Sequence, residues 1–542
     1  MVIRYITVVM IIQILLSSTI YANAASSVDV YSHGKGTVGD DIGKQKYWNI
    51  SPGNTIDYYI HYAGTPDISG TNEFAVVQRG FQTWENDPAS YIDYTYKGTT
   101  TRSASIIENS MSDGYSVVKW VNNVFVGLAI TLDGTVFTNS NVIREVDIAF
   151  NDGYTWCING ASGSDGCTTG EYDVETVALH EAGHTLFLDD LSYDSSQVMY
   201  FDYMGVRTQL QYGDRAGVRY IYANTVTAGS SVGTETQDAD IAIAEINNST
   251  NNRPDIVIAW ADNPAGANTI KYRYGWDIST TGTTSSWSSD NSISNIGDET
   301  QGVGVSLVNL DSNARRELII AWIDNPSGNN TIKYRIGWNI DTSGNPSSWS
   351  TTKNVPSSDV GNESQGLGIA FVNIDNNSRP EMFVFWADNP FGSNRIYYKI
   401  GWNVNTSGDA ASWSNRIDTN VSPGDETAGL GVSIANWLEQ SQPDILVFWI
   451  DNPIGNNKGY YVVGVDISSS GYPTWQARKE IPNYFRGVGD ESQGAGVAII
   501  NIGNNDNNRV EAVFLWIDNP ILDNYAKYRV EWSGRMGTNS HK

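Results

Sequence analysis

The chain has 542 residues, and its 60 acidic side chains outnumber 33 Lys and Arg, for a formal net charge of −27. Nucleic acids and anionic membrane surfaces attract clustered cations, so this charge argues against either as a partner. Aromatic residues make up 11 % of the chain and there are 52 glycines. That mixture is too aromatic for a disordered acidic tail and too rich in glycine for long helices. The length predicts about two to four domains.

The N-terminus predicts a secretory signal peptide over residues 1–24. Arg4 supplies a small positive region, Ile6–Leu16 is a short apolar run, and residues 22–24 offer small side chains for cleavage. A retained membrane anchor is the alternative, but a span needs roughly 20 apolar residues and this run is shorter. We therefore expect cleavage after residue 24 and a secreted, extracellular protein without a membrane span.

Residues 25–225 form the first predicted domain, where helical and strand patterns alternate irregularly. Val76–Trp84 has the apolar spacing of a helix, and Glu145–Phe150 alternates like a strand. The two cysteines of the chain, Cys157 and Cys167, lie in a Gly/Ser-rich loop. They could bind a metal, but no His or further Cys lies nearby to complete such a site. An oxidising compartment favours a disulfide between them.

The strongest chemical signal is the sequence His180-Glu181-Ala182-Gly183-His184. On a helix, residues i and i+4 share one face, so both imidazoles can reach one metal ion. Glu181 points just aside, where it can deprotonate a water on the metal. Asp173 is placed to cap this helix at its N-terminus. The alternative is an exposed pair of histidines on a helix that binds no metal.

A tetrahedral catalytic zinc needs a third protein ligand and an open position. The residues after His184 are Thr-Leu-Phe-Leu-Asp-Asp. Here the chain resembles the metzincin metalloproteases, and within them the matrixin group. Their pattern is His-Glu-x-x-His-x-x-Gly-x-x-His, with Asp as the last ligand in some bacterial members such as snapalysin. The resemblance implies that His180, His184 and Asp190 bind zinc and that Glu181 is the general base.

The chain departs from this pattern at one position. The glycine that lets the family's chain turn sharply after the helix is Phe187 here. A bulky residue tolerates a positive φ poorly, so the turn is expected to differ. Asp189 is then the alternative third ligand.

Three further segments extend the resemblance. Gln197–Tyr200 matches the Met-turn, which implies that Met199 forms the hydrophobic floor below the zinc. Leu210–Tyr222 resembles the closing helix of the family. Val146–Asn151 resembles the edge strand against which a peptide substrate lies as an added strand. The resemblance implies an α+β catalytic domain with a twisted, mostly parallel sheet and a zinc-binding helix.

Residues 226–534 form the second predicted domain, and 535–542 a tail. The phrase Trp-(Ile/Ala)-Asp-Asn-Pro recurs every 62 to 67 residues, beginning at Trp260, Trp322, Trp386, Trp449 and Trp516. Three or four short strands per repeat predict an all-β domain, a β-propeller with about five blades. The recurring Trp is interpreted as a core residue and Asp-Asn-Pro as a turn. The last repeat lacks a fourth strand, which residues 225–231 could supply to close a ring.

Calcium is a second metal to consider. The repeats resemble those of integrin-alpha-type propellers, because Asn309–Asn313 and Asn373–Asn377 are similar to the calcium loops of that family. In the first domain, Asp147, Asn151 and Asp152 are candidates for structural calcium.

Together these patterns predict a secreted zinc-dependent endopeptidase that cleaves protein or peptide substrates with metal-activated water. Its repeats would bind the substrate, the extracellular matrix or a cell surface. The alternative is an extracellular adhesin or lectin-like protein whose metalloprotease-like domain is degenerate. That alternative is supported by Phe187 and by the greater mass of the repeat region.

Overall fold

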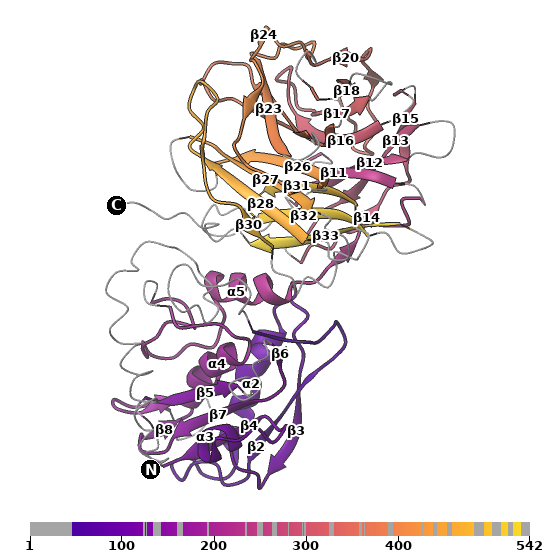
Figure 1. Cartoon of the computed structure of the whole chain (residues 1–542). Helices are drawn as coiled ribbons and strands as arrows, with labels where there is room; N and C mark the ends of the chain where they lie inside the picture. The colour runs from indigo at the N-terminus through magenta and orange to yellow at the C-terminus, as the bar shows by residue number, and fades with distance from the viewer. Residues whose placement is uncertain are drawn as a thin grey trace. The chain divides into compact units, whose positions relative to one another are not determined.

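The structure is a computed structural model of the chain (Figure 1). It describes residues 46–122, 125, 127–133, 142–159, 166–191, 195–233, 236–246, 253–262, 268–279, 281–294, 296–297, 300–324, 330–356, 360–361, 364–388, 394–424, 427–436, 442–451, 458–481, 493–500, 511–518 and 524–532. The predicted signal peptide and the predicted tail lie outside these residues. The chain divides into two compact units, the first ending at Tyr222 and the second beginning at Ala223. None of the described helices has the length and apolar character needed to cross a membrane.

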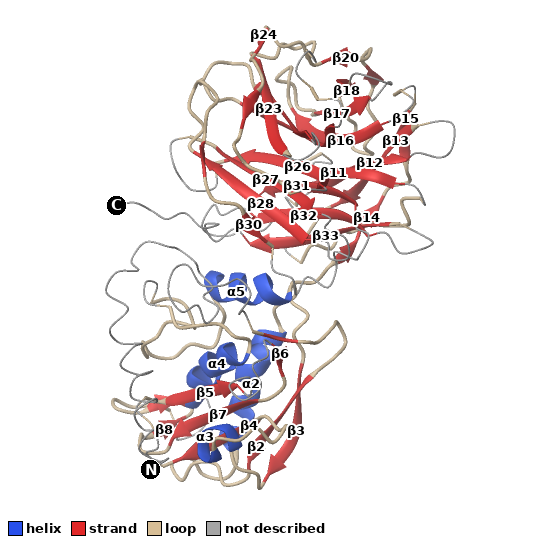
Figure 2. Ribbon diagram, in the orientation of Figure 1, coloured by secondary structure: helices blue, strands red, loops and turns tan. Residues whose placement is uncertain are grey.

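The first unit combines one mixed sheet with helices (Figure 2). Its helices are α2 (Asn72–Glu85), α3 (Ser105–Asn109), α4 (Val174–Thr185) and α5 (Tyr212–Tyr222). The five-stranded sheet contains β2 (Ile56–His61), β3 (Tyr94–Thr100), β4 (Val117–Val121), β5 (Ala129–Asp133) and β7 (Val146–Asn151). Four short strands pair outside it: β1 (Tyr47–Trp48) with β6 (Val142–Ile143), and β8 (Trp156–Cys157) with β9 (Tyr172–Asp173).

The strand order is β3-β2-β4-β7-β5, with three parallel pairings and one antiparallel pairing, between β5 and β7. The prediction that Val146–Asn151 is an edge strand is therefore wrong. This strand is β7, which lies between β4 and β5, and all six of its residues are buried. The edge position was implied by the family resemblance. The Asp147 carboxylate of this strand is buried and accepts the N–H groups of Ile106 and Val117, each at 2.9 Å. The two edge strands of the sheet are β3 and β5, and β5 is the edge next to β7.

Helices α2 and α4 pack closely, which ties α4 to the core. A Cβ at Gly80 would lie 2.8 Å from the backbone N of Leu179, so only glycine allows this approach. The buried indole of Trp84 donates a hydrogen bond to the carbonyl of Leu179 at 2.8 Å. These contacts place α4, with its His-Glu-x-x-His sequence, at a defined depth beside the sheet.

The second unit is a β-propeller of five blades, each an antiparallel sheet. The first blade contains β11 (Thr236–Ala244), β12 (Asp255–Asp262), β13 (Thr269–Trp276), β14 (Ser286–Trp287) and β15 (Asn291–Ile293). The second contains β16 (Thr300–Val308), β17 (Glu317–Asp324), β18 (Thr331–Trp338), β19 (Ser348–Trp349) and β20 (Lys353–Asn354). The third contains β21 (Ser364–Val372), β22 (Glu381–Asp388), β23 (Arg395–Trp402), β24 (Ser412–Trp413) and β25 (Ile417–Asp418), and the fourth contains β26 (Thr427–Ala435), β27 (Asp444–Asp451), β28 (Lys458–Val465), β29 (Thr474–Trp475) and β30 (Lys479–Glu480). The fifth is β31 (Gln493–Ile500), β32 (Glu511–Asp518), β33 (Tyr525–Trp532) and β10 (Val226–Thr227).

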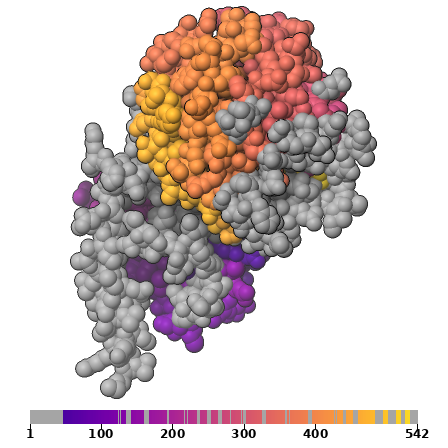
Figure 3. Space-filling model, turned by 45° about the horizontal axis from the view of Figure 1, so that its top comes forward, coloured from indigo at the N-terminus to yellow at the C-terminus, as the bar shows by residue number. Residues whose placement is uncertain are grey.

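The blades form a closed ring, because each innermost strand contacts the next and β31 contacts β11. Figure 3 shows the orange surface of the later blades bordering the yellow surface of the last strands. The expected closure by residues 225–231 is confirmed, since Val226 and Thr227 of β10 pair with β33. The five recurring Trp residues are confirmed as core, each at most 1 % exposed. The Asp two residues after each of these Trp residues is the last residue of the second strand in its blade.

The innermost strands meet at the propeller axis with little space. The second to fifth blades carry Gly-x-Gly there, and a Cβ at Gly429 would lie 2.4 Å from the N of Ala495. The first blade carries Asp238 and Asp240 instead, both fully buried. They accept the N–H groups of Val303 and Val305 from the second blade, at 2.8 and 2.9 Å. Burial raises the pKa of both carboxyls, and the backbone N–H groups that they accept oppose this rise.

Replacing Asp238 by Ala is expected to destabilise the propeller. The variant leaves buried backbone N–H groups without an acceptor, at a cost of about 1–3 kcal/mol for each. Denaturant unfolding followed by Trp fluorescence would measure the loss, and Asp238→Asn, which keeps an acceptor oxygen, should cost less. An unchanged unfolding midpoint in Asp238→Ala would show that the axis does not depend on these bonds.

Candidate functional site

Helix α4 begins where the sequence predicted. Asp173 is its N-cap, and the buried carboxylate accepts the N–H of Thr176 at 2.9 Å and that of Asn159 at 2.9 Å. Cys157 pairs with Asp173 in the β8–β9 ladder. Cys157 also forms the predicted disulfide with Cys167. The disulfide therefore braces the strand pair from which α4 starts.

The two imidazoles of α4 point their Nε2 atoms at one place. These atoms are 3.1 Å apart. The other ring nitrogen of each is hydrogen-bonded to a backbone carbonyl, His180 Nδ1 to Val198 at 2.8 Å and His184 Nδ1 to Leu188 at 2.6 Å. A carbonyl only accepts, so in the neutral imidazole Nδ1 carries the proton and Nε2 offers its lone pair. This is how metal-binding histidines are oriented in proteins.

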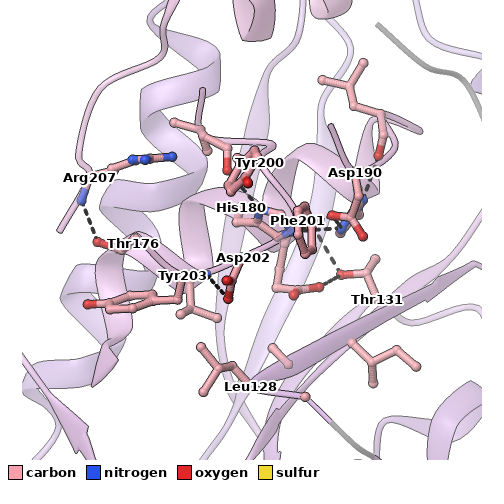
Figure 4. A pocket seen from close by; sticks show the side chains of 18 of the residues that line it. Leu128, Thr131, Thr176, His180, Asp190, Tyr200, Phe201, Asp202, Tyr203 and Arg207 are labelled. Carbon is pink, nitrogen blue, oxygen red and sulfur yellow. Dashed lines mark hydrogen bonds and ion pairs between the residues drawn. The ribbon is translucent and has the colours of Figure 1, made fainter. Parts of the chain in front are cut away.

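Asp190 completes a three-atom cluster with these imidazoles (Figure 4). Its Oδ1 lies 3.1 Å from His180 Nε2 and 3.5 Å from His184 Nε2. Three ligand atoms on a tetrahedral zinc, each about 2.0–2.1 Å from the metal, lie about 3.3 Å apart. The donor set and its spacing therefore fit zinc. Asp189, the alternative ligand, also lines the cleft around the cluster.

The cluster is electrostatically coupled. Burial lowers the pKa of His184, but the hydrogen bond and the charge of Asp190 outweigh it and raise the pKa to about 10. Burial raises the pKa of Asp190, but its bonds to both imidazoles hold that pKa far below the usual range. A metal at this position competes with the proton on His184, so its binding should release protons.

The turn after α4 is made with Phe187 in the glycine position. Phe187 has φ +68°, in the left-handed region. Its N–H donates to His184 O at 2.9 Å, and the N–H of Leu188 donates to Gly183 O at 3.2 Å. The expectation that a bulky residue would change the turn is wrong, because Phe187 itself adopts the left-handed backbone conformation. The turn brings Leu188 O to His184 and Asp190 to both imidazoles.

Glu181 lies close to both imidazoles. Atoms of Glu181, His180 and His184 that could bind a metal lie within 4.8 Å of one another. The Glu181 side chain is buried, and its Oε2 accepts a hydrogen bond from the hydroxyl of Thr131 at 2.5 Å (Figure 4). Thr131 is on the edge strand β5, so the sheet fixes the direction of the Glu181 carboxylate. No motif in the sequence pointed to Thr131.

Replacing Thr131 by Val is expected to reduce kcat for peptide hydrolysis about tenfold or more. The ionised Glu181 loses a hydrogen bond, and bonds to charged groups contribute about 1.5–3 kcal/mol. KM should change little, because the Thr131 hydroxyl acts on Glu181 and not on the substrate. Thr131→Ser keeps the hydroxyl and should restore kcat. A rise of KM at unchanged kcat in Thr131→Val would contradict this positioning role.

Met199 lies directly under α4, as the Met-turn predicted. A Cβ at Gly183 would lie 2.2 Å from Met199 Sδ, so the helix and the methionine are in close contact. The N–H groups of Val198 and Met199 donate to the buried carboxylate of Asp214, at 2.9 and 3.0 Å. Burial raises the pKa of Asp214, and these N–H groups oppose the rise. Asp214 is on α5, so this helix holds the Met-turn in place.

The cluster opens into a cleft of about 750 Å³. Strand β5 contributes one wall, and residues 200–205 after the Met-turn contribute another. Phe201 and Met204 are more than half exposed. Among the described strands, only β7 pairs with β5, and a sheet edge beside a metal-type cluster can take up an extended peptide as an added strand.

The calcium candidates have other partners in the structure. Asp147 accepts two backbone N–H groups, and burial raises its pKa to about 7. Asn151 Oδ1 accepts the N–H of Gly153, and Asp152 accepts the hydroxyl of Thr65. In the repeats, Asp311 and Asp375 each accept bonds from the Asn two residues later. Calcium binding stays a prediction.

Two imidazoles and a glutamate on one helix, a third carboxylate after a sharp turn and a methionine beneath form an arrangement similar to the site of a metalloprotease. Residues 48–223 match the family model described as Matrixin. The match covers the first unit, and the repeats lie outside it. No curated protein matches the chain in sequence.

Solved structures similar to the chain include several carbohydrate-acting or carbohydrate-binding proteins. A GH62 hydrolase in complex with xylotriose is 11 % identical and covers 56 % of this chain and 96 % of its own, with a TM-score of 0.36. An alpha-L-arabinofuranosidase from Podospora anserina is 11 % identical over 56 % and 95 %, with a TM-score of 0.35. The Aleuria aurantia lectin is 12 % identical over 55 % and 98 %, with a TM-score of 0.26. At such TM-scores the likeness supports no inference about a ligand of the repeats.

Proposed function

We propose that the chain is a secreted zinc-dependent endopeptidase. Its catalytic domain would span residues 25–225 and its repeat domain residues 226–534, which would bind the substrate or an extracellular surface. The observation that carries the proposal is the convergence of His180 Nε2, His184 Nε2 and Asp190 Oδ1 at distances of 3.1 to 3.5 Å. The proposal takes Asp190 as the third ligand, which the snapalysin-like pattern also implied, and these distances support it. We also propose that the repeats bind calcium as a structural ion.

Each residue of the site would have its own role in peptide hydrolysis. Zinc, when bound by His180, His184 and Asp190, supplies Lewis-acid chemistry that polarises the scissile carbonyl and activates water. Glu181 takes the proton of the attacking water and passes it to the leaving amine. Thr131 holds the Glu181 carboxylate in the direction needed for both transfers. The free edge of β5 binds the substrate as an added strand.

The test is peptide hydrolysis by the full chain loaded with zinc, using a broad library of quenched fluorescent peptides. Cleavage that stops on adding a chelator and returns on adding zinc is the expected result. No cleavage of any peptide or denatured protein would overturn the proposal and leave the adhesin or lectin-like alternative. Binding of the same preparation to a glycan array would then test that alternative directly.

A further inference from the structure

Phe187 combines backbone strain with a position in the cleft. Its φ of +68° lies in the left-handed region, which a bulky residue adopts only at a cost in free energy. Glycine adopts this conformation without that cost. The turn itself therefore does not explain a phenylalanine at this position. Strain of this kind concentrates at functional sites, where the side chain has a use.

The surroundings of Phe187 indicate that use. Its half-buried ring lines the cleft. Lys46 Nζ lies 5.2 Å from the ring centroid and 2.9 Å from the carboxylate of Asp133, which also lines the cleft. The ammonium is thus held by the ring and by the last residue of β5. Phe187 and Asp133 line the cleft, and Lys46 contacts both of them. We name this group of three side chains the Phe187 platform.

We propose that the Phe187 platform is a substrate subsite that selects an apolar or aromatic side chain. This inference rests on the proposed function, because it concerns the peptide that Glu181 would cleave. The charges of Lys46 and Asp133 neutralise each other, so the platform offers a substrate no net charge. What remains for recognition is the aromatic ring, against which apolar and aromatic side chains pack favourably.

The register of β5 sets the distance of the platform from the reaction. Thr131 lies beside Glu181, and Asp133 lies two residues further along the same strand. A strand rises about 3.4 Å per residue, so Asp133 lies about 7 Å along β5 from Thr131, the residue that contacts Glu181. A peptide added to β5 would therefore place there a side chain about two residues from the scissile bond. The side is the one that runs past the C-terminal end of β5.

The experiment measures a preference ratio. Peptides with one cleavable core would carry Phe, Leu, Gly, Arg or Glu two or three residues to either side of the cleaved bond. For the zinc-loaded full chain, kcat/KM should be about tenfold higher with Phe or Leu than with Gly at one of these positions. Phe187→Ala and Phe187→Gly should bring that ratio close to one, whereas Phe187→Tyr should keep it.

Thermal unfolding provides an independent readout of the strain. Phe187→Gly should raise the Tm of the first unit by a few degrees, whereas Phe187→Ala, which keeps a Cβ, should not. Ser110→Gly is the matched control, because Ser110 has φ +54° at the end of α3 and does not line the cleft. It should raise Tm without changing the preference ratio.

The outcomes separate the two proposals. If the unsubstituted protein cleaves no peptide, the proposed function fails. If it cleaves peptides but Phe187→Ala and Phe187→Gly keep its preference for Phe and Leu, the substrate subsite is overturned while the peptidase stands. A preference for Arg or Glu at the platform position would also overturn it.

Discussion

Glu181→Gln is expected to lower kcat/KM for peptide hydrolysis by about 100- to 10,000-fold, the range that a positioned general base contributes. The amide has nearly the shape of the carboxylate but cannot accept a proton from water. Thr131 donates a hydrogen bond to the Glu181 carboxylate, and its hydroxyl can also bond the amide oxygen of the variant, so the side chain should keep its position. Steady-state kinetics with the best peptide of the library would measure the fall.

The metal content of this variant separates chemistry from binding. Glu181→Gln should retain zinc, because the converging atoms of His180, His184 and Asp190 are unchanged. Full zinc content with lost activity is the expected pair of results. Activity within a few fold of the unsubstituted protein would remove Glu181 from the role of base, whatever the metal content.

Asp190→Ala is expected to weaken zinc binding by more than 100-fold. Mutation of the partners that only orient a ligand typically costs 10–100-fold in metal affinity, and the loss of a ligand should cost more. Asp190 Oδ1 is the atom that closes the cluster with both imidazoles. Competition with a chromogenic chelator would measure the dissociation constant of the unsubstituted and variant proteins.

Asp189→Ala is the matched control for that measurement. Asp189 is the neighbouring carboxylate on the same turn and lines the same cleft. Its removal should leave zinc affinity within a few fold of the original. Equal losses in both variants, or a larger loss in Asp189→Ala, would transfer the ligand role to Asp189.

The ligand helix was predictable because each of its signals is local. The N-cap Asp173, the apolar positions and the i, i+4 histidines all lie within one short segment, and the structure keeps each of them in the predicted helix. The turn that follows was predicted less well. The low propensity of bulky residues for positive φ argued against φ +68° at Phe187. The hydrogen bonds of the turn and the contact of the ring with Lys46 stabilise this conformation.

The parts of the site that sequence reasoning missed depend on long-range contacts. Thr131 reaches Glu181 from a strand 50 positions away, and Asp214 reaches the Met-turn from α5. Strand β5 has five residues that are all half-buried, so it shows no alternation that would identify it. Strand β7 was misplaced because its edge position was taken from the family resemblance, and its own residues do not reveal that β5 pairs with it.

The repeats were predictable because every blade buries the same kind of residue at the same place on its second strand. A Trp on the second strand of every blade is buried against its neighbours, so the same phrase returns every 62 to 67 residues. The special role of Asp238 and Asp240 was not predicted. It arises only at the axis, where five innermost strands meet and one blade supplies acceptors to another.

The seam of the fifth blade has a consequence for the order of folding. Ser231 donates a hydrogen bond to the carbonyl of Asn524, a residue 293 positions later in the chain. Strand β10 emerges from the ribosome before any blade and must wait until β33 has been synthesised. Single blades have short-range pairings and can form early, whereas the seam closes a loop of almost the whole unit. We therefore expect sealing of the seam to be the last and slowest step of propeller folding, with the outer edge of β33 uncovered until then.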